Sequence, residues 1–251
     1  MPELVFLGTA AALPDPDREN THLCLVGDSS LILVDCAGQP LQRLQHAGLD
    51  PLNLTDIILT HFHPDHVYGM PALLLGLWLL GYRDTLHIYG LTDCLTRLQA
   101  LLNLFEWRNW PNFYPVEFCA VPETELALVL RNNDFEIYAT PGKHHIPVIG
   151  LRIETRATQR ITVYSSDTEP CPAITRLATG ADLLIHEATG ASVGHSSAVQ
   201  AGTVATIARV GELALIHYHL FTQTTTDLLR AAQSSFDRQV WLATDFAKIP
   251  L

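Results

Sequence analysis

The sequence predicts an α/β fold in which strands and helices pack in layers. Three observations predict it: short apolar stretches are punctuated by Gly, Pro, Asn and Asp, helical patterns lie between them, and most strand-like stretches end in a polar or ionisable residue. A chain of 251 residues with 48% hydrophobic residues can bury a large core. No linker or low-complexity segment interrupts it, so we expect a single domain over residues 1–251.

The first half of the chain alternates strands with helices. Apolar stretches that predict strands cover residues 4–7, 23–26, 31–35 and 56–60. A helical pattern over residues 39–47 ends at Gly48. The longest apolar stretch, residues 70–82, is shorter than the roughly 20 residues that cross a bilayer, so we expect a buried helix there.

The second half repeats this alternation. Strands are predicted over residues 135–139, 150–154, 161–165, 183–186 and 213–217. The pattern over residues 196–209 predicts a helix. Layered α/β folds build their sites from residues at strand ends, so these ends are where we expect the chemistry.

A metal-binding motif follows the strand at 56–60. His61, His63, Asp65 and His66 occupy offsets 0, 2, 4 and 5 of one loop. Imidazole and carboxylate are ligands that suit Zn, Mn and Fe. We interpret His61 and His63 as ligands of one ion, and Asp65 and His66 as ligands of a second. The alternative, a set of solvated loop histidines, does not explain four ligand-type residues at this spacing.

Three later strand ends complete a two-metal site. His144, Asp167 and His217 each follow or end a predicted strand. We expect His144 beside the first ion, His217 beside the second, and Asp167 bridging both. Two cations bridged by a carboxylate lie about 3.5 to 4 Å apart and activate a water for attack on phosphorus or carbonyl carbon. On the residues alone, His145 and His219 remain alternative ligands.

Composition limits the partners and the compartment. Lys and Arg number 15 against 26 Asp and Glu, a net charge of -11, which counts against a nucleic-acid partner. Bound divalent cations would offset some of these carboxylates locally. Five cysteines without CxxC spacing fit reduced thiols, and the N-terminus has no secretory pattern, so we expect a cytoplasmic protein.

These motifs resemble the metallo-β-lactamase superfamily, whose HxHxDH signature matches His61 to His66. More narrowly, the chain is similar to the ribonuclease Z branch. The segments that match that branch are 6–9, 34–36, 69–74, 88–90, 186–189 and 194–196. The resemblance implies a four-layer αββα sandwich with a dinuclear site at one edge, holding two divalent ions, Zn²⁺ or alternatively Mn²⁺ or Fe. The family's spacing from His144 to Gly150 favours His144 over His145 and His217 over His219.

The resemblance also implies roles for three residues. Glu187 and His195 match a glutamate and a histidine that are paired beside the metals, so His195 is expected to be a general acid oriented by Glu187. Asp65 is expected to accept a proton and to hold the attacking hydroxide in line. The alternative for Glu187 and His195 is a buried ion pair at a helix start.

Four segments depart from the branch or lack an explanation in it. Residues 154–160 leave room only for a short turn where tRNA-processing members carry a long arm, and Ser166 replaces the usual Gly before Asp167. The acidic motif after the second strand is reduced to Asp35-Cys36-Ala37-Gly38, which we expect to alter the rim of the pocket. The aromatic segment 105–114 fits a wall for an aryl group or nucleobase, a dimer edge, or core packing beneath a loop.

The predicted function is a zinc-dependent, ribonuclease Z-like hydrolase of phosphodiester bonds. A small or short single-stranded substrate is favoured over intact pre-tRNA, because Lys143 and Lys248 are the only lysines and phosphate contacts dominate nucleic-acid affinity. The nearer alternative is a carboxyl ester, thioester or sulfate ester hydrolase, and the more distant one is an iron-dependent redox protein. Dimers are common in the branch, so a homodimer is also expected.

Overall fold

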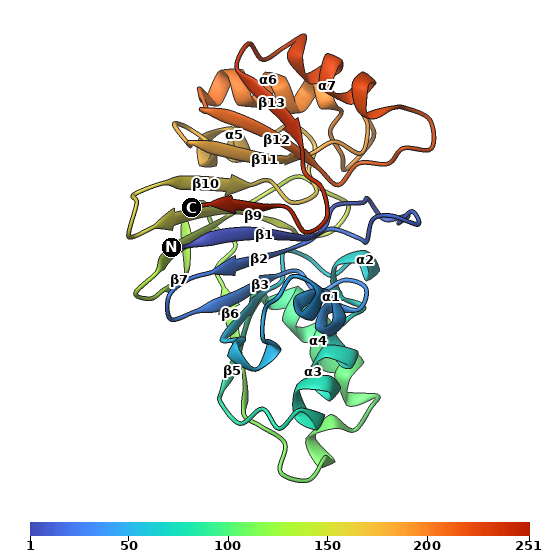
Figure 1. The fold of residues 1–251 in the computed structure, drawn as a ribbon, viewed down its shortest axis with the longest axis vertical. Helices are drawn as coiled ribbons and strands as arrows, with labels where there is room; N and C mark the ends of the chain where they lie inside the picture. The colour runs from blue at the N-terminus through green and yellow to red at the C-terminus, as the bar shows by residue number, and fades with distance from the viewer.

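The computed structural model describes residues 1–251 and contains two seven-stranded sheets that pack face to face, with helices on their outer faces (Figure 1). The first sheet has the order β14 (Lys248–Pro250), β1 (Glu3–Gly8), β2 (His22–Val26), β3 (Leu31–Val34), β4 (Asp56–Ile58), β5 (Leu86–Leu91), β6 (Val116–Val121). The second has the order β13 (Gln239–Leu242), β12 (Glu212–Ile216), β11 (Leu183–Glu187), β10 (Ile161–Tyr164), β9 (Ile149–Thr155), β8 (Phe135–Pro141), β7 (Ala127–Arg131). The predicted αββα sandwich is confirmed.

The helices divide between the two outer layers. Those that follow strands of the first sheet are α1 (Pro40–His46), α2 (Pro64–Val67), α3 (Met70–Leu79) and α4 (Thr92–Asn103), with the 3-10 turns η1 (Pro51–Asn53) and η2 (Trp107–Asn109). Those of the second sheet are α5 (Pro172–Leu177), α6 (Ala198–Ala208) and α7 (Thr225–Gln233). Capping boxes begin α6 at Ser197 and α7 at Thr224.

Both sheets are mixed, and their strand directions bring five strand ends to one edge of the sandwich. Strands β3 to β6 are parallel, as are β10 to β13, whereas β7 to β10 are antiparallel. Consequently β8, β10, β11 and β12 point the same way, and the loops after them gather beside the loop after β4. The chain termini lie at the opposite edge, where Glu3 of β1 pairs with Pro250 of β14 (Figure 1).

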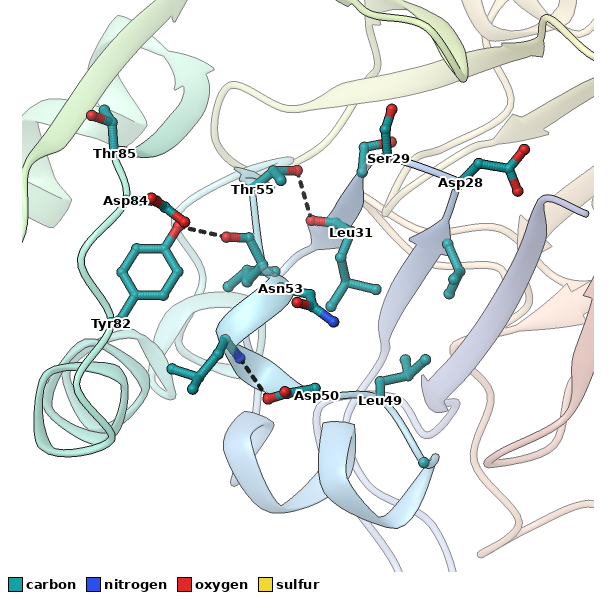
Figure 2. A pocket seen from close by; sticks show the side chains of 16 residues that line it. Asp28, Ser29, Leu31, Leu49, Asp50, Asn53, Thr55, Tyr82, Asp84 and Thr85 are labelled. Carbon is teal, nitrogen blue, oxygen red and sulfur yellow. Dashed lines mark hydrogen bonds between the residues drawn. The ribbon is translucent and has the colours of Figure 1, made fainter.

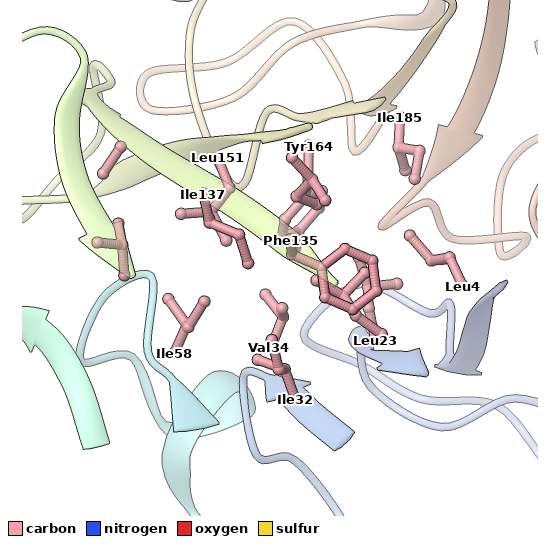
Figure 3. Packing of buried hydrophobic residues seen from close by; sticks show 14 of the residues in the cluster. Leu4, Leu23, Ile32, Val34, Ile58, Phe135, Ile137, Leu151, Tyr164 and Ile185 are labelled. Carbon is pink, nitrogen blue, oxygen red and sulfur yellow. The ribbon is translucent and has the colours of Figure 1, made fainter. Parts of the chain in front are cut away.

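Apolar residues on both faces of the strands build three core layers. In β1, Leu4 and Phe6 point between the sheets while Val5 and Leu7 point toward the helices, as the period of two dictates. Figure 3 shows side chains of the two sheets, such as Ile58 and Ile137, facing one another in the central layer. Strands buried on both faces read as continuous apolar runs, which is why the sequence reveals them.

The predicted helix over residues 70–82 exists as α3, but it is not buried all round. Met70, Leu73 and Leu77 are buried, whereas Leu79 is 70% exposed. The expectation of a buried helix was therefore wrong for one face, because α3 lies in an outer layer and only one side of it meets the sheet. No helix of the chain combines the length and the apolarity that a bilayer crossing requires.

The aromatic segment 105–114 packs mainly into the outer core of the first sheet. Trp107 and Tyr114 are buried in it, and Trp110 packs against Trp78 with ring centroids 5.4 Å apart and the ring planes tilted by 33°. Phe105 stays 51% exposed. Core packing beneath a loop is thus what the structure shows for the two buried rings.

The edge of the sandwich away from the β4 loop holds a short turn and a cavity. The connection between β9 and β10 is a tight turn over residues 156–160, so the expected absence of a long arm is confirmed there. A cavity of about 680 Å³ lies at the edge away from the β4 loop, among turns that precede β3, β4 and β5. Figure 2 shows Asp28, Asp50 and Tyr82 around it.

Candidate metal centre

The loop after β4 presents its ligand-type side chains through a short helix. His63 is the N-terminal cap residue of α2, Pro64 takes the first helical position, and Asp65 and His66 lie in the single turn that follows. The backbone of His66 is anchored to the end of β3, because the Cys36 N–H donates to the His66 carbonyl at 2.7 Å.

A first cluster joins three histidines from two loops. His63 Nδ1 lies 3.1 Å from His61 Nε2 and 3.0 Å from His144 Nε2. The structure therefore brings His144, rather than His145, to the other two. His145 is exposed and forms a separate group with His144 and His195.

A second cluster joins two carboxylates and two histidines. His66 Nε2 lies 3.5 Å from Asp65 and 3.6 Å from Asp167. His217 Nε2 lies 3.4 Å from Asp65 and 3.5 Å from Asp167. His219 is outside this cluster and stacks on Phe221 instead.

Asp167 stands between the two clusters. Its Oδ2 is 4.0 Å from His61 Nε2 and 3.9 Å from His144 Nε2, besides its contact with His66. Its Oδ1 lies 3.5 Å from His217 Nε2, so the carboxylate faces both groups of ligands. Asp167 therefore lies between the two groups that the sequence assigns to separate ions.

The two clusters fit divalent cations. A tetrahedral ion with bonds of about 2.0–2.1 Å separates its ligand atoms by about 3.3–3.4 Å, and the shorter ligand separations here are 3.0–3.6 Å. His66 Nε2 and Asp167 Oδ1 are also buried without a hydrogen-bond partner, a costly state that a cation would relieve.

The charge states of His61 and Asp167 suit metal ligands. Burial holds the pKa of His61 well below its ordinary value, so this imidazole is neutral. Burial alone would raise the pKa of Asp167, but His217 and His66 outweigh it and lower that pKa well below its ordinary value. Burial would lower the pKa of His66 and His217, but the neighbouring carboxylates outweigh it and raise both, so a cation that binds there would displace their protons. Neutral imidazole and ionised carboxylate are the forms that bind metals.

Each ligand histidine is held through its other ring nitrogen, except His63. His66 Nδ1 lies 2.8 Å from Asp35, His217 Nδ1 lies 2.8 Å from the Thr189 hydroxyl, and His144 Nδ1 donates to the Gly194 carbonyl at 2.6 Å. His61 Nδ1 lies 3.0 Å from the Thr60 hydroxyl. Such partners fix the tautomer and the ring orientation of a metal ligand.

Asp35 corrects one expectation. The sequence suggested that the shortened motif beginning at Asp35 alters the rim of the pocket, but the Asp35 side chain is fully buried and accepts hydrogen bonds from Thr60 while it faces His66. The prediction was wrong because a residue that follows a strand was expected to be exposed at the rim of the pocket. An acid that directly follows the apolar run 31–34 is the sequence signal that could have indicated an orienting carboxylate.

Glu187 and His195 form the expected pair beside the clusters. His195 Nδ1 lies 3.0 Å from Glu187 Oε1 and 4.0 Å from Asp167. Glu187 is fully buried, and the backbone N–H groups of Thr168, Thr189 and Ser196 also donate to it. Burial opposes protonation of His195, but Glu187 outweighs it and raises the pKa of His195.

Comparison with known proteins decides the family. A family model described as "Anti-Pycsar protein Apyc1" matches residues 2–236. The ribonuclease Z of Methanothermobacter thermautotrophicus is 31% identical over an alignment that covers 98% of this chain and 94% of the relative. The chain belongs to the Apyc1 family, a ribonuclease Z-like branch of the metallo-β-lactamase fold.

Other relatives of this ribonuclease Z-like chain agree. The ribonuclease BN of an Enterobacter species is 28% identical, with 98% of this chain and 99% of the relative covered. The short form of human tRNase Z has a TM-score of 0.77 at 25% identity, covering 99% and 98% of the two chains. The metallo-β-lactamase fold protein YhfI from Bacillus subtilis has a TM-score of 0.85 at 23% identity, covering 99% and 98%.

Membership makes the ribonuclease Z-like chain a metal-dependent hydrolase of phosphodiester bonds, and the predicted activity class is confirmed at this level. The alignment with the archaeal ribonuclease Z spans 296 positions, more than the 251 residues of this chain, so that relative carries segments that this chain lacks. The β9–β10 turn, over residues 156–160, is one place where this chain has only a short connection.

Proposed function

We propose that the chain is a dinuclear zinc phosphodiesterase. The observation that carries the proposal is the pair of ligand clusters that share Asp167. The seven proposed ligands are His61, His63, Asp65, His66, His144, Asp167 and His217. Three histidines would hold one ion, and Asp65, His66 and His217 would hold the other, with Asp167 between them.

Zinc ions in such a site would polarise the phosphodiester and supply a nucleophilic water near neutral pH. Asp65, whose side chain is 14% exposed, would accept a proton from that water and keep it in line. His195 is 19% exposed and oriented by Glu187, so we propose that it donates a proton to the departing oxygen.

Small or short phosphodiesters are the substrates we propose. Nucleic-acid affinity depends on phosphate contacts from Lys and Arg, and this chain carries 15 such residues against 26 acidic ones. Lys143, next to the proposed ligand His144, is paired with Glu169 at 2.7 Å and so is already neutralised. The β9–β10 turn also offers no arm to hold a large RNA.

We also propose a cytoplasmic location and a homodimer. All five cysteines are free, and Cys24, Cys36 and Cys94 are buried, which suits a reducing compartment. Leu79 and Leu104 are 70% and 79% exposed, and a partner subunit would cover such apolar side chains. Light scattering of the purified protein gives the oligomeric state directly.

The activity is tested by assaying the purified protein, with its metal content measured, on bis(p-nitrophenyl) phosphate, p-nitrophenyl acetate and p-nitrophenyl sulfate in parallel. We expect the phosphodiester to be turned over fastest, Asp65→Ala to abolish turnover and His195→Ala to reduce it. Faster turnover of the acetate or the sulfate would reject the proposal. Turnover of cyclic nucleotides, short oligonucleotides and pre-tRNA then shows which size of substrate the enzyme prefers.

A further inference from the structure

The backbone of Gly194 lies between the proposed ligand His144 and an acidic side chain outside the metal centre. The Gly194 carbonyl accepts a hydrogen bond from His144 Nδ1 at 2.6 Å, and the Gly194 N–H donates to Glu169 Oε1 at 3.0 Å. Gly194 has a φ of +82°, and a Cβ at this position would come within 2.8 Å of the His145 ring. The two contacts therefore rest on a backbone conformation that only glycine fits there.

Glu169 belongs to the loop that carries Asp167, and it is joined to the loop that carries His144. Its Oε2 lies 2.7 Å from Lys143 Nζ, and its N–H donates to the Lys143 carbonyl at 2.8 Å. The Lys143 N–H donates to the Thr168 hydroxyl at 3.0 Å. Glu169 thus connects three loops, which hold His144, Asp167 and His195.

The loop before His195 has few other contacts outside itself. Val193 is 72% exposed, and the bonds from Gly190 to Ser196 and from His195 to Ser192 are internal to the loop. Its contacts with the rest of the site are those of Gly194 with Glu169 and His144, those of His195 and Ser196 with Glu187, and the bond that the Ser196 hydroxyl donates to the Thr168 carbonyl at 2.7 Å.

We propose that Glu169 is a positioning residue that holds the Gly194 backbone in place, so that His144 keeps its ring orientation and His195 stays beside the reacting phosphate. Glu169 makes no direct contact with the ring of His144 or of His195. Without its carboxylate, the Gly194 amide loses its acceptor and the loop can move away from His144. This inference rests on the proposed function for His195, while the part that concerns His144 depends only on metal binding.

The competing explanation is an exposed ion pair between Glu169 and Lys143 with no further role. Lys143 is 64% exposed, and exposed ion pairs contribute little to stability. Three variants separate the explanations. Glu169→Ala removes both contacts, Glu169→Gln keeps an oxygen for the Gly194 amide, and Lys143→Met removes only the ion pair.

The first measurement is zinc affinity, by competition with a chromophoric chelator. We expect Glu169→Ala to weaken one of the two zinc sites by about tenfold, the size of effect typical of residues that orient metal ligands. Glu169→Gln and Lys143→Met should stay close to the unsubstituted protein. Hydrogen exchange of the Gly194 amide should accelerate only in Glu169→Ala, and the midpoint of thermal unfolding reports whether any variant fails to fold.

The second measurement compares leaving groups in the zinc-loaded enzyme. Glu169→Ala should lower kcat on a dinucleotide, whose departing alkoxide needs a proton, by about tenfold. It should lower kcat much less on bis(p-nitrophenyl) phosphate, with KM unchanged. Equal effects of Lys143→Met and Glu169→Ala, or unchanged zinc affinity and amide exchange in Glu169→Ala, would overturn the inference. If the unsubstituted protein hydrolyses no phosphodiester, the proposed function fails while zinc affinity and amide exchange still test Glu169.

Discussion

At the scale of single residues, the site consists of ligand side chains and the groups that hold them. Asp35 is one of these holding groups. It is fully buried, lies 2.8 Å from His66 Nδ1, and accepts from both the N–H and the hydroxyl of Thr60. A carboxylate in this position keeps His66 Nε2 directed at Asp65 and Asp167.

Replacing this carboxylate should therefore weaken metal binding without removing a ligand. We expect Asp35→Asn to lower the affinity of the Asp65–His66–His217 site by about 10- to 100-fold, because the amide cannot match a carboxylate as the partner of His66. The metal retained after dialysis against a chelator measures the effect. Circular dichroism serves as the control for folding, and full retention of both ions would contradict the role of Asp35.

His144 and His145 provide a matched pair for testing the ligand assignment. His144 Nε2 lies 3.0 Å from His63, whereas His145 is exposed at the edge of the site. We expect His144→Ala to lose one ion and nearly all activity, and His145→Ala to bind both. Metal stoichiometry by elemental analysis decides between them, and the reverse result would move the ligand to His145.

At the scale of elements, the predicted strands could be recognised because they are apolar on both faces. Their ends could be recognised because polar residues interrupt the apolar stretches. The sequence also placed the turn over 156–160 and the helix that begins after Ser197. It missed the four edge strands β6, β7, β13 and β14, whose exposed residues break the pattern, and it also missed the inner strand β5. It missed the contacts that His66, His217 and His144 make through Nδ1 as well. Those contacts join residues far apart in the chain, which no local pattern encodes.

Backbone strain at the site was visible only as a departure in sequence. Three residues there have positive φ without being glycine: Asp35 at 60°, Ser166 at 53° and His217 at 51°. The usual Gly of the ribonuclease Z branch at the Ser166 position is explained by this conformation. Strain of this kind persists where the surrounding structure requires it.

Restoring glycine should relieve that strain. We expect Ser166→Gly to raise the free energy of unfolding by about 1 kcal/mol, because the left-handed conformation costs a non-glycine residue about that much. The Ser166 hydroxyl is also buried without a partner, so its removal adds no unpaired group. Urea unfolding of the two proteins measures the change, and a loss of stability would show that the hydroxyl has an unseen partner.

At the scale of the whole molecule, the first half of the chain builds most of the first sheet, the second half builds the second sheet, and the two meet at the metal centre. The first half supplies the four residues of the HxHxDH motif, and the second supplies His144, Asp167 and His217. The central core draws on both sheets, and β14 from the C-terminus joins the first one. We therefore propose that residues 1–251 form one domain, since neither half could complete the core or the site.

Asp134 joins the two sheets at the edge opposite the metal centre. It lies in the turn between β7 and β8, and it accepts from the N–H and hydroxyl of Ser29, the hydroxyl of Ser30 and the N–H of Asp28, all in the turn between β2 and β3. A Cβ on Gly27 would come within 2.4 Å of the Asp134 carboxyl carbon, so glycine permits this approach.

Removing this carboxylate should destabilise the whole fold in a pH-dependent way. Burial alone would raise the pKa of Asp134, but the donors of Ser30 and Ser29 outweigh it and lower the pKa. A lowered folded pKa means that the stabilisation is complete above the unfolded value, near pH 4, and is lost as the pH falls through the folded value. We expect Asp134→Ala to cost about 2 kcal/mol at pH 7, since hydrogen bonds to a charged group contribute about that much. Urea unfolding from pH 7 to pH 3 should show the two proteins converging at low pH, whereas a constant difference would place the effect in packing rather than in the ionised carboxylate.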